Sequence, residues 1–217
     1  MKFGKIEKSF ALLFVILIST VTLYFYQNRQ FNQKINTEFI KQQLSFPYYL
    51  KPGKDIGYSM LLGDLNGLNR NAYESLLALI TGTYGTKNSW VIVPSIMPEK
   101  SAVQLNEVEE SDFFEQVANK RGVVLVDNFC TSEWENIKKK QIYELSSLSP
   151  GPFCFSEKET RDLNRLIKTM SIKKVYLIYD VESYLEFISN FTGYLEENEI
   201  DYEFVRSYDT GNIKDQI

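Results

Sequence analysis

The sequence predicts an α/β domain with a mainly parallel sheet of about five or six strands and helices on both faces. Short apolar runs alternate along the chain with segments of helical periodicity, which is typical of repeated strand–helix units. The runs are continuously apolar, as expected for strands that are buried on both faces. This domain is expected to span residues 55–208, after an N-terminal transmembrane helix and a helical stem and before a flexible tail at 209–217.

Residues 10–26 form an uncharged, apolar segment that predicts a transmembrane helix. At about 1.5 Å per residue, a helix of this length just crosses a hydrocarbon core. Lysines crowd residues 1–9, so this short tail is expected to be cytoplasmic and the domain periplasmic or extracellular. In a Gram-negative bacterium the membrane would be the inner one. A cleaved signal peptide is the alternative, but the segment ends in aromatic residues and no small-residue cleavage site follows.

Residues 27–54 are predicted to be a stem and linker. Phe31, Ile35 and Phe39 recur at a spacing of four, which gives a narrow apolar stripe on a helix. This stripe fits a membrane helix that continues into solvent, and it leaves oligomerisation through the stem open. Pro52 marks the boundary with the domain.

Within the domain, five apolar runs and one shorter run are predicted as strands. The run at residues 90–93 is expected to stop at Pro94, because proline has no amide hydrogen to donate to a neighbouring strand. The runs are residues 58–62, 90–93, 123–126, 153–155, 175–179 and 202–205.

Helical periodicity fills the intervals between these runs. Two helix starts carry the pattern of a capping box, Ser132 with Glu135 and Ser156 with Glu159. The predicted helices cover residues 71–80, a stretch from Ser111 to the residue before Gly122, stretches that begin at Ser132 and at Ser156, and residues 181–195.

The composition excludes several classes of chemistry. The sequence has no histidine, so histidine-based triads, dyads and metal sites are ruled out. Its formal net charge is −4, which argues against a nucleic-acid partner. No cofactor is predicted from the motifs.

Acidic residues follow three of the predicted strands. Asp64, Asp127 and Asp180 lie there, with Glu182 two residues further on, and parallel sheets bind ligands at the carboxyl ends of their strands. Such carboxylates suit Mg²⁺ or Mn²⁺, so these four residues are the catalytic and metal-ligand candidates. The structural alternative for each aspartate is an ordinary helix N-cap.

Cys130 and Cys154 form the other candidate pair. They are too far apart in sequence for a C-x-x-C redox motif. Outside the cytoplasm they are expected to form one structural disulfide, worth about 3 kcal/mol. In a cytoplasmic domain, both would be buried small apolar residues.

The sequence shows no convincing catalytic constellation, and its preferred interpretation is therefore not enzymatic. We expect a single-pass membrane protein whose outer domain binds other envelope proteins, as part of a secretion, conjugation or pilus assembly. The alternative is a membrane-anchored, metal-dependent transferase or hydrolase that uses the four acidic residues. This alternative requires the carboxylates to converge.

Overall fold

The computed structural model describes residue 19 and residues 44–51, 53, 57–67, 69–81, 88–101, 117–140, 143–144, 146–180 and 188–207. The chain divides into two compact units, Met1–Gln43 and Leu44–Ile217. Apart from Ser19, the transmembrane helix expected at 10–26 lies outside the described residues, as do the tails at 1–9 and 209–217. Among the residues that are described, no helix has the length and apolar character needed to cross a bilayer.

A five-stranded sheet forms the centre of the second unit in the described part of the chain, in the order β1-β3-β2-β4-β5. Strands β2 to β5 are parallel, and β1 runs antiparallel to β3 at one edge. The predicted α/β class with a mainly parallel sheet is thereby confirmed. The strands are β1 (Tyr49–Lys51), β2 (Tyr58–Asp64), β3 (Ser89–Ser95), β4 (Lys174–Tyr179) and β5 (Asp201–Arg206).

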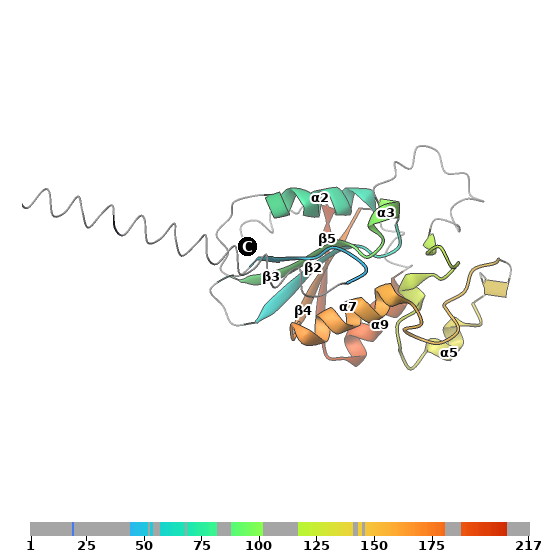
Figure 1. Cartoon of the computed structure of the whole chain (residues 1–217). Helices are drawn as coiled ribbons and strands as arrows, with labels where there is room; N and C mark the ends of the chain where they lie inside the picture. The colour runs from blue at the N-terminus through green and yellow to red at the C-terminus, as the bar shows by residue number, and fades with distance from the viewer. Residues whose placement is uncertain are drawn as a thin grey trace, which may run out of the picture. The chain divides into compact units, whose positions relative to one another are not determined.

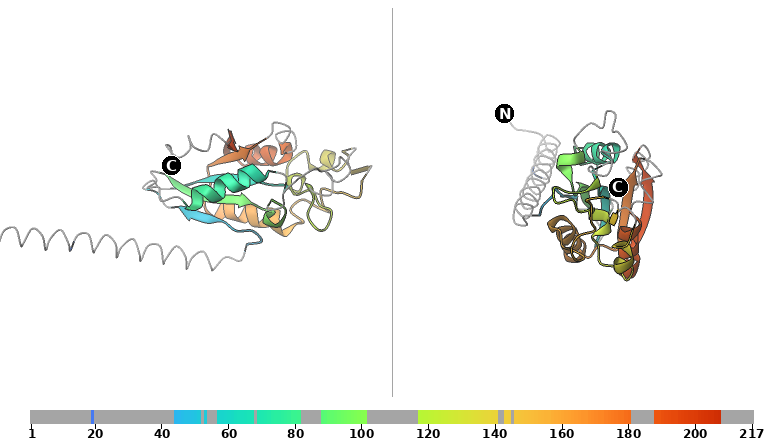
Figure 2. Two further views of the ribbon diagram at one scale, coloured as in Figure 1. Left: turned by 90° about the horizontal axis from the view of Figure 1, so that it is seen from above. Right: turned by 90° about the vertical axis from the view of Figure 1, so that its right-hand side faces the viewer.

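Helices cover both faces of this sheet. Helix α2 lies along one face, and α7 and α9 lie on the opposite face (Figure 1). Viewed from above, α2 runs along the strands (Figure 2). The described helices are α2 (Arg70–Thr81), α3 (Pro98–Ser101), the 3₁₀ turn η1 (Leu125–Asp127), α5 (Trp134–Ile137), α7 (Lys158–Thr169) and α9 (Ser189–Glu197).

The central strand β2 supplies side chains to both layers of the core. Met60 and Leu62 pack in the larger cluster with Leu163 of α7, while Leu61 packs in the smaller cluster with Leu76 of α2. All three β2 side chains are fully buried. Successive residues of a strand point to opposite faces, so a continuous apolar run is what a sheet covered on both sides requires.

Two of the predicted strands are wrong. Val123 and Val124 form only isolated bridges, and the chain then turns into η1. Residues 153–155 form a turn, with Phe153 exposed. Residues 123–126 are apolar because they are buried in the core beside α7 and α9, not because they join the sheet.

Helix and strand ends differ from the predictions at several points. Strand β3 continues through Pro94 to Ser95, beyond the part that pairs with β1, so the missing amide hydrogen removes no bond to β1.

Neither predicted capping box forms. The N-cap residues of α5 and α7 are Glu133 and Glu157, and neither side chain caps its helix. Most of the helix expected from Ser111 and the first half of the one expected at 181–195 lie outside the described residues.

Strand β1 lies within the segment that the sequence assigns to the linker. The compact unit begins at Leu44, and both Phe46 and Tyr48 belong to its buried core. The antiparallel pairing of Tyr49 with Ile92 extends the sheet by one edge strand.

Candidate functional site

A cavity of about 360 Å³ lies where β3 ends and α7 begins, and we call it the α7 pocket. It therefore opens at the carboxyl edge of the parallel sheet, where open α/β sheets bind their ligands. Five of its lining side chains are cationic and three are acidic, a positive balance in an acidic protein. The lining residues are Ser45, Ile96, Met97, Pro98, Glu99, Lys100, Asn119, Lys120, Arg121, Glu157, Lys158, Glu159 and Arg161.

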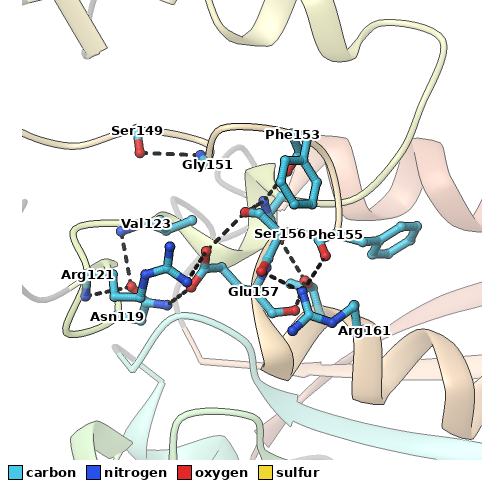
Figure 3. Close-up of polar contacts among 12 residues, drawn as sticks. Asn119, Arg121, Val123, Ser149, Gly151, Phe153, Phe155, Ser156, Glu157 and Arg161 are labelled. Carbon is cyan, nitrogen blue, oxygen red and sulfur yellow. Dashed lines mark hydrogen bonds and ion pairs between the residues drawn. The ribbon is translucent and has the colours of Figure 1, made fainter.

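Glu157 is the buried acidic residue of the α7 pocket, with only 1% of its surface exposed. The Asn119 amide donates to its Oε2 at 2.7 Å, and the Ser156 hydroxyl donates to its Oε1 at 3.0 Å. The guanidinium of Arg121 lies 3.4 Å from the same Oε1 (Figure 3). These three partners hold the carboxylate in one orientation and offset part of its charge.

The cationic side chains of the pocket differ in how firmly they are held. Arg161 donates to the backbone carbonyls of Phe155 and Ser156, which fixes the turn before α7. Arg121 is two-thirds exposed and contacts Glu157 at a long distance, so its guanidinium remains accessible to a ligand. The α7 N-terminus adds the partial positive charge of the helix dipole.

Asp162 anchors the wall of the pocket on the first turns of α7. Its Oδ2 accepts hydrogen bonds from Lys158 at 2.7 Å and from the backbone amide of Ser45 at 2.7 Å. Burial alone would raise the pKa of Asp162, but the hydrogen bonds from Lys158 and Ser45 together lower this pKa below its ordinary value. The segment before β1 is thereby tied to α7.

Two of the sequence candidates lie at the ends of neighbouring strands. Asp64 ends β2, and its Oδ1 accepts the backbone amides of Asn66 and Gly67 at 3.1 and 3.0 Å. Asp180 follows β4, and its carboxylate accepts hydrogen bonds from Asn71 and Ser207. Asp64 therefore stabilises the turn that follows β2, whereas Asp180 links the end of β4 to α2 and to the residue after β5.

Asp127 lies apart from these two, in η1. Both of its oxygens accept a hydrogen bond from Lys140 at 3.0 Å, and Tyr143 donates to Oδ2. Burial, with a further contribution from the charge of Asp127, raises the pKa of Tyr143. Glu182, the fourth candidate, lies outside the described residues.

The described residues do not fit a hydrolytic metal centre. Zinc sites in proteins are built from histidine, cysteine and acidic ligands, but the sequence has no histidine and its two cysteines are bonded to each other. Across the described ranges, no three acidic or cysteine side chains are placed to hold one metal ion. The site is therefore built from cations, amides and the buried Glu157.

A disulfide joins Cys130 to Cys154, with their Cα atoms 4.9 Å apart. The second cysteine lies two residues before Ser156 and three before Glu157, so this bond closes the loop that leads into the α7 pocket. Phe129 packs beside it against Phe155, Phe191 and Tyr194, at ring-centroid distances of 5.6, 4.7 and 5.2 Å. The loop is thus fixed to α9 as well as to the segment after η1.

Sequence reasoning missed Glu157, Arg121 and Asn119. For Glu157, the local signal is the concentration of charge around the helix start at Ser156, where the sequence predicts a capping box. Asn119 and Arg121 lie in another segment, just before Gly122. Glu157 and Arg121 are 36 positions apart and meet only through the tertiary structure.

No protein-family model matches this chain, and no curated protein is similar to it in sequence. Among solved structures, it is similar to the murein-tripeptide amidase MpaA from Escherichia coli O157, with a TM-score of 0.51 and 15% identity. That alignment covers 78% of this chain and 82% of MpaA. The product-bound cell shape determinant protein Csd4 from Helicobacter pylori matches with a TM-score of 0.35 and 11% identity, over 78% of this chain and 44% of Csd4.

The likeness to MpaA contradicts the expectation of a protein-interaction component of an envelope assembly. The fold of the chain is one that a murein-tripeptide amidase also has. The earlier expectation depended on finding no catalytic constellation in the sequence. A site assembled from residues far apart in the chain leaves no such local pattern.

Proposed function

We propose that residues 44–207 form a hydrolase domain that binds a carboxylate-bearing peptide in the α7 pocket and cleaves one of its amide bonds. The substrate class is that of the murein tripeptide named for MpaA, whose fold the chain shares. The observation that carries the proposal is the excess of cationic side chains around a buried carboxylate at the carboxyl edge of the sheet. The fold likeness supports the reaction class.

The substrate carboxylate would be bound by the side chains of Arg121 and Lys158 and by the backbone amides at the N-terminus of α7. A guanidinium pairs with a carboxylate through two parallel hydrogen bonds, and a helix N-terminus presents unpaired amide groups. Hydrogen bonds to a charged group contribute about 1.5–3 kcal/mol each. The carboxylate would therefore set both the affinity and the orientation of the peptide.

Glu157 is the proposed general base, because it is the buried carboxylate of the pocket. It takes a proton from a water molecule whose oxygen adds to the carbonyl carbon of the amide. The carbon–nitrogen bond then breaks, and Glu157 returns the proton to the leaving nitrogen. The products are a carboxylic acid and an amine, and no step passes through a metal, since the described residues supply no ligand set for one.

The disulfide supports an extracytoplasmic location for this activity, because disulfides persist in oxidising compartments. A domain outside the cytoplasm, held by a membrane helix at 10–26 with its N-terminus inside, is part of the proposal.

The test is binding and turnover of a murein tripeptide by the purified full-length chain, with the C-terminally amidated peptide as the comparison. Calorimetry measures the affinity, and mass spectrometry measures amine release. Arg121→Ala is expected to weaken binding about tenfold or more, and Glu157→Gln to abolish turnover with little change in affinity. Arg70→Ala is the matched control, because Arg70 is also ion-paired, to Glu74, but lies on α2 outside the pocket.

Each half of the proposal has its own contrary outcome. Equal affinity for the acid and the amide, or no binding of either, would overturn the proposed substrate. Tight binding without release of an amine would overturn the hydrolytic step while leaving the pocket as a peptide site. Turnover that disappears with EDTA would show that a metal is needed after all.

A further inference from the structure

Asn128 lies at the centre of the loop that leads into α7, and it is completely buried. Its Nδ2 contacts three acceptors, the carbonyls of Pro150 and Phe153 at 2.6 and 3.2 Å and the hydroxyl oxygen of Ser156 at 2.9 Å. One side chain thus holds two points of the disulfide-closed loop and Ser156, which follows that loop.

The other end of the same amide holds the start of α7. Its Oδ1 accepts the backbone amide of Glu157 at 3.1 Å and the hydroxyl of Thr160 at 2.7 Å. The backbone carbonyl of Asn128 also accepts the amide of Phe155 at 2.6 Å. Asn128 therefore fixes both the loop and the first helical turn, which meet at Glu157.

A chain of hydrogen bonds continues from Asn128 to the proposed base. The amide donates to the Ser156 hydroxyl, and that hydroxyl donates to Glu157 Oε1 at 3.0 Å. Because a hydroxyl has one hydrogen, accepting from Asn128 orients its own hydrogen toward the carboxylate. The Asn128 amide thus orients the hydroxyl that bonds to Oε1, while Asn119 bonds to Oε2.

We infer that Asn128 is a positioning residue, which sets the location and orientation of the Glu157 carboxylate through its backbone amide and through Ser156. This inference rests on the proposed function, in which Glu157 is the base. It adds a residue that lines no part of the pocket and was not a candidate from the sequence.

Asn190 provides a control of the same chemical type. It is also buried, and its amide donates to the carbonyl of Phe129 at 3.1 Å while its oxygen accepts the hydroxyl of Thr131 at 2.7 Å. Replacing Asn190 removes a comparable buried amide of α9, whose partners Phe129 and Thr131 lie on either side of Cys130. None of the described bonds of Asn190 goes to Ser156 or Glu157.

The experiment compares Asn128→Asp and Asn190→Asp in the full-length chain, by the pH profile of peptide turnover. Asn128→Asp keeps the acceptor oxygen, loses the donor to Ser156 and adds a negative charge linked to Glu157, whose facing charged side chain is Arg121. The acid limb of the profile is expected to move to higher pH, since the added negative charge favours binding of a proton within this chain of hydrogen bonds. Asn190→Asp is expected to leave that limb in place.

Ser156→Ala keeps the inference testable if Asn128→Asp does not fold, because it breaks the chain of hydrogen bonds while Asn128 keeps its other partners. It is expected to lower kcat about tenfold with KM little changed. Identical pH profiles for the two aspartate variants, or an unchanged kcat for Ser156→Ala, would overturn the inference.

Hydrogen exchange separates this inference from the proposed function. Asn128→Ala is expected to speed amide exchange at residues 155–161, and Asn190→Ala to leave exchange there unchanged. If the wild-type protein cleaves no peptide, the proposed function fails. Hydrogen exchange then still tests whether Asn128 fixes the loop and the start of α7. Equal exchange at 155–161 in both variants would overturn the positioning role whatever the activity.

Discussion

Gly151 occupies a tightly confined position beside Asn128 and Ser156. Its φ is +99°, in the region that favours glycine, and a Cβ built there would lie 2.3 Å from Ser156 Oγ and 2.5 Å from Asn128 Nδ2. Gly57 has a similar φ of +109°, but a Cβ there would meet nothing within 4 Å. The two glycines therefore separate the cost of backbone strain from the cost of a steric clash.

Gly151→Ala is expected to lower the free energy of unfolding by about 2–4 kcal/mol, because strain and overpacking act together. Gly57→Ala is expected to lose about 1 kcal/mol from backbone strain alone. Urea denaturation of both variants measures the difference. Equal losses at the two positions would show that the loop around Asn128 can relax to admit a methyl group.

Polar residues at this scale show why the candidate site was hard to predict. The sequence identifies Asp64, Asp127 and Asp180 as acidic residues near strand ends, but it does not show that each already has hydrogen-bond partners. No local sequence pattern distinguishes Glu157 from the exposed glutamates of the chain. Its burial depends on Arg121 and Asn119, which come from another segment.

At the scale of elements, the described residues between 117 and α7 contribute no strand to the sheet, and other contacts hold this segment. The disulfide spans a sequence separation of 24 residues, and Phe129 packs against α9 next to it. The loop entropy of a closure of this length corresponds to about 3 kcal/mol.

Replacing both Cys130 and Cys154 by serine is therefore expected to lower the free energy of unfolding by about 3 kcal/mol. Urea denaturation with and without a reductant measures this. The reductant should destabilise the wild-type protein by a similar amount and have no effect on the double variant. A wild-type protein that is equally stable in its reduced form would show that noncovalent contacts, those of Phe129 and Asn128 among them, are enough to hold the loop.

At the scale of the whole molecule, both described core clusters draw their residues from the unit that begins at Leu44. Phe46 and Tyr48 are buried in the larger cluster, and β1 covers the edge of β3. Full burial of such side chains contributes about 1.5–3 kcal/mol each. The segment before residue 55 is thus part of the fold.

A fragment of residues 44–217 is expected to unfold in one cooperative transition, because its core is complete. A fragment of residues 55–217, cut at the boundary that the sequence suggested, lacks β1, Phe46 and Tyr48 and is expected to melt at a clearly lower temperature. Circular dichroism during heating compares them. Equal melting temperatures would mean that β1 adds nothing to the stability of the sheet.

The sequence by itself determined the α/β class, the parallel strands β2 to β5 and the helices α2 and α7, because apolar runs and helical periodicity are local patterns. The membrane helix at 10–26 also depends on a local pattern, and it stays a prediction. Tertiary structure alone decided that residues 123–126 leave the sheet and that β1 joins it. It also decided that Arg121 meets Glu157 in the α7 pocket and that Asn128 bonds to the start of α7. The reason is physical: a residue's neighbours along the chain set its backbone preference, but its burial and its partners depend on segments that only folding brings together.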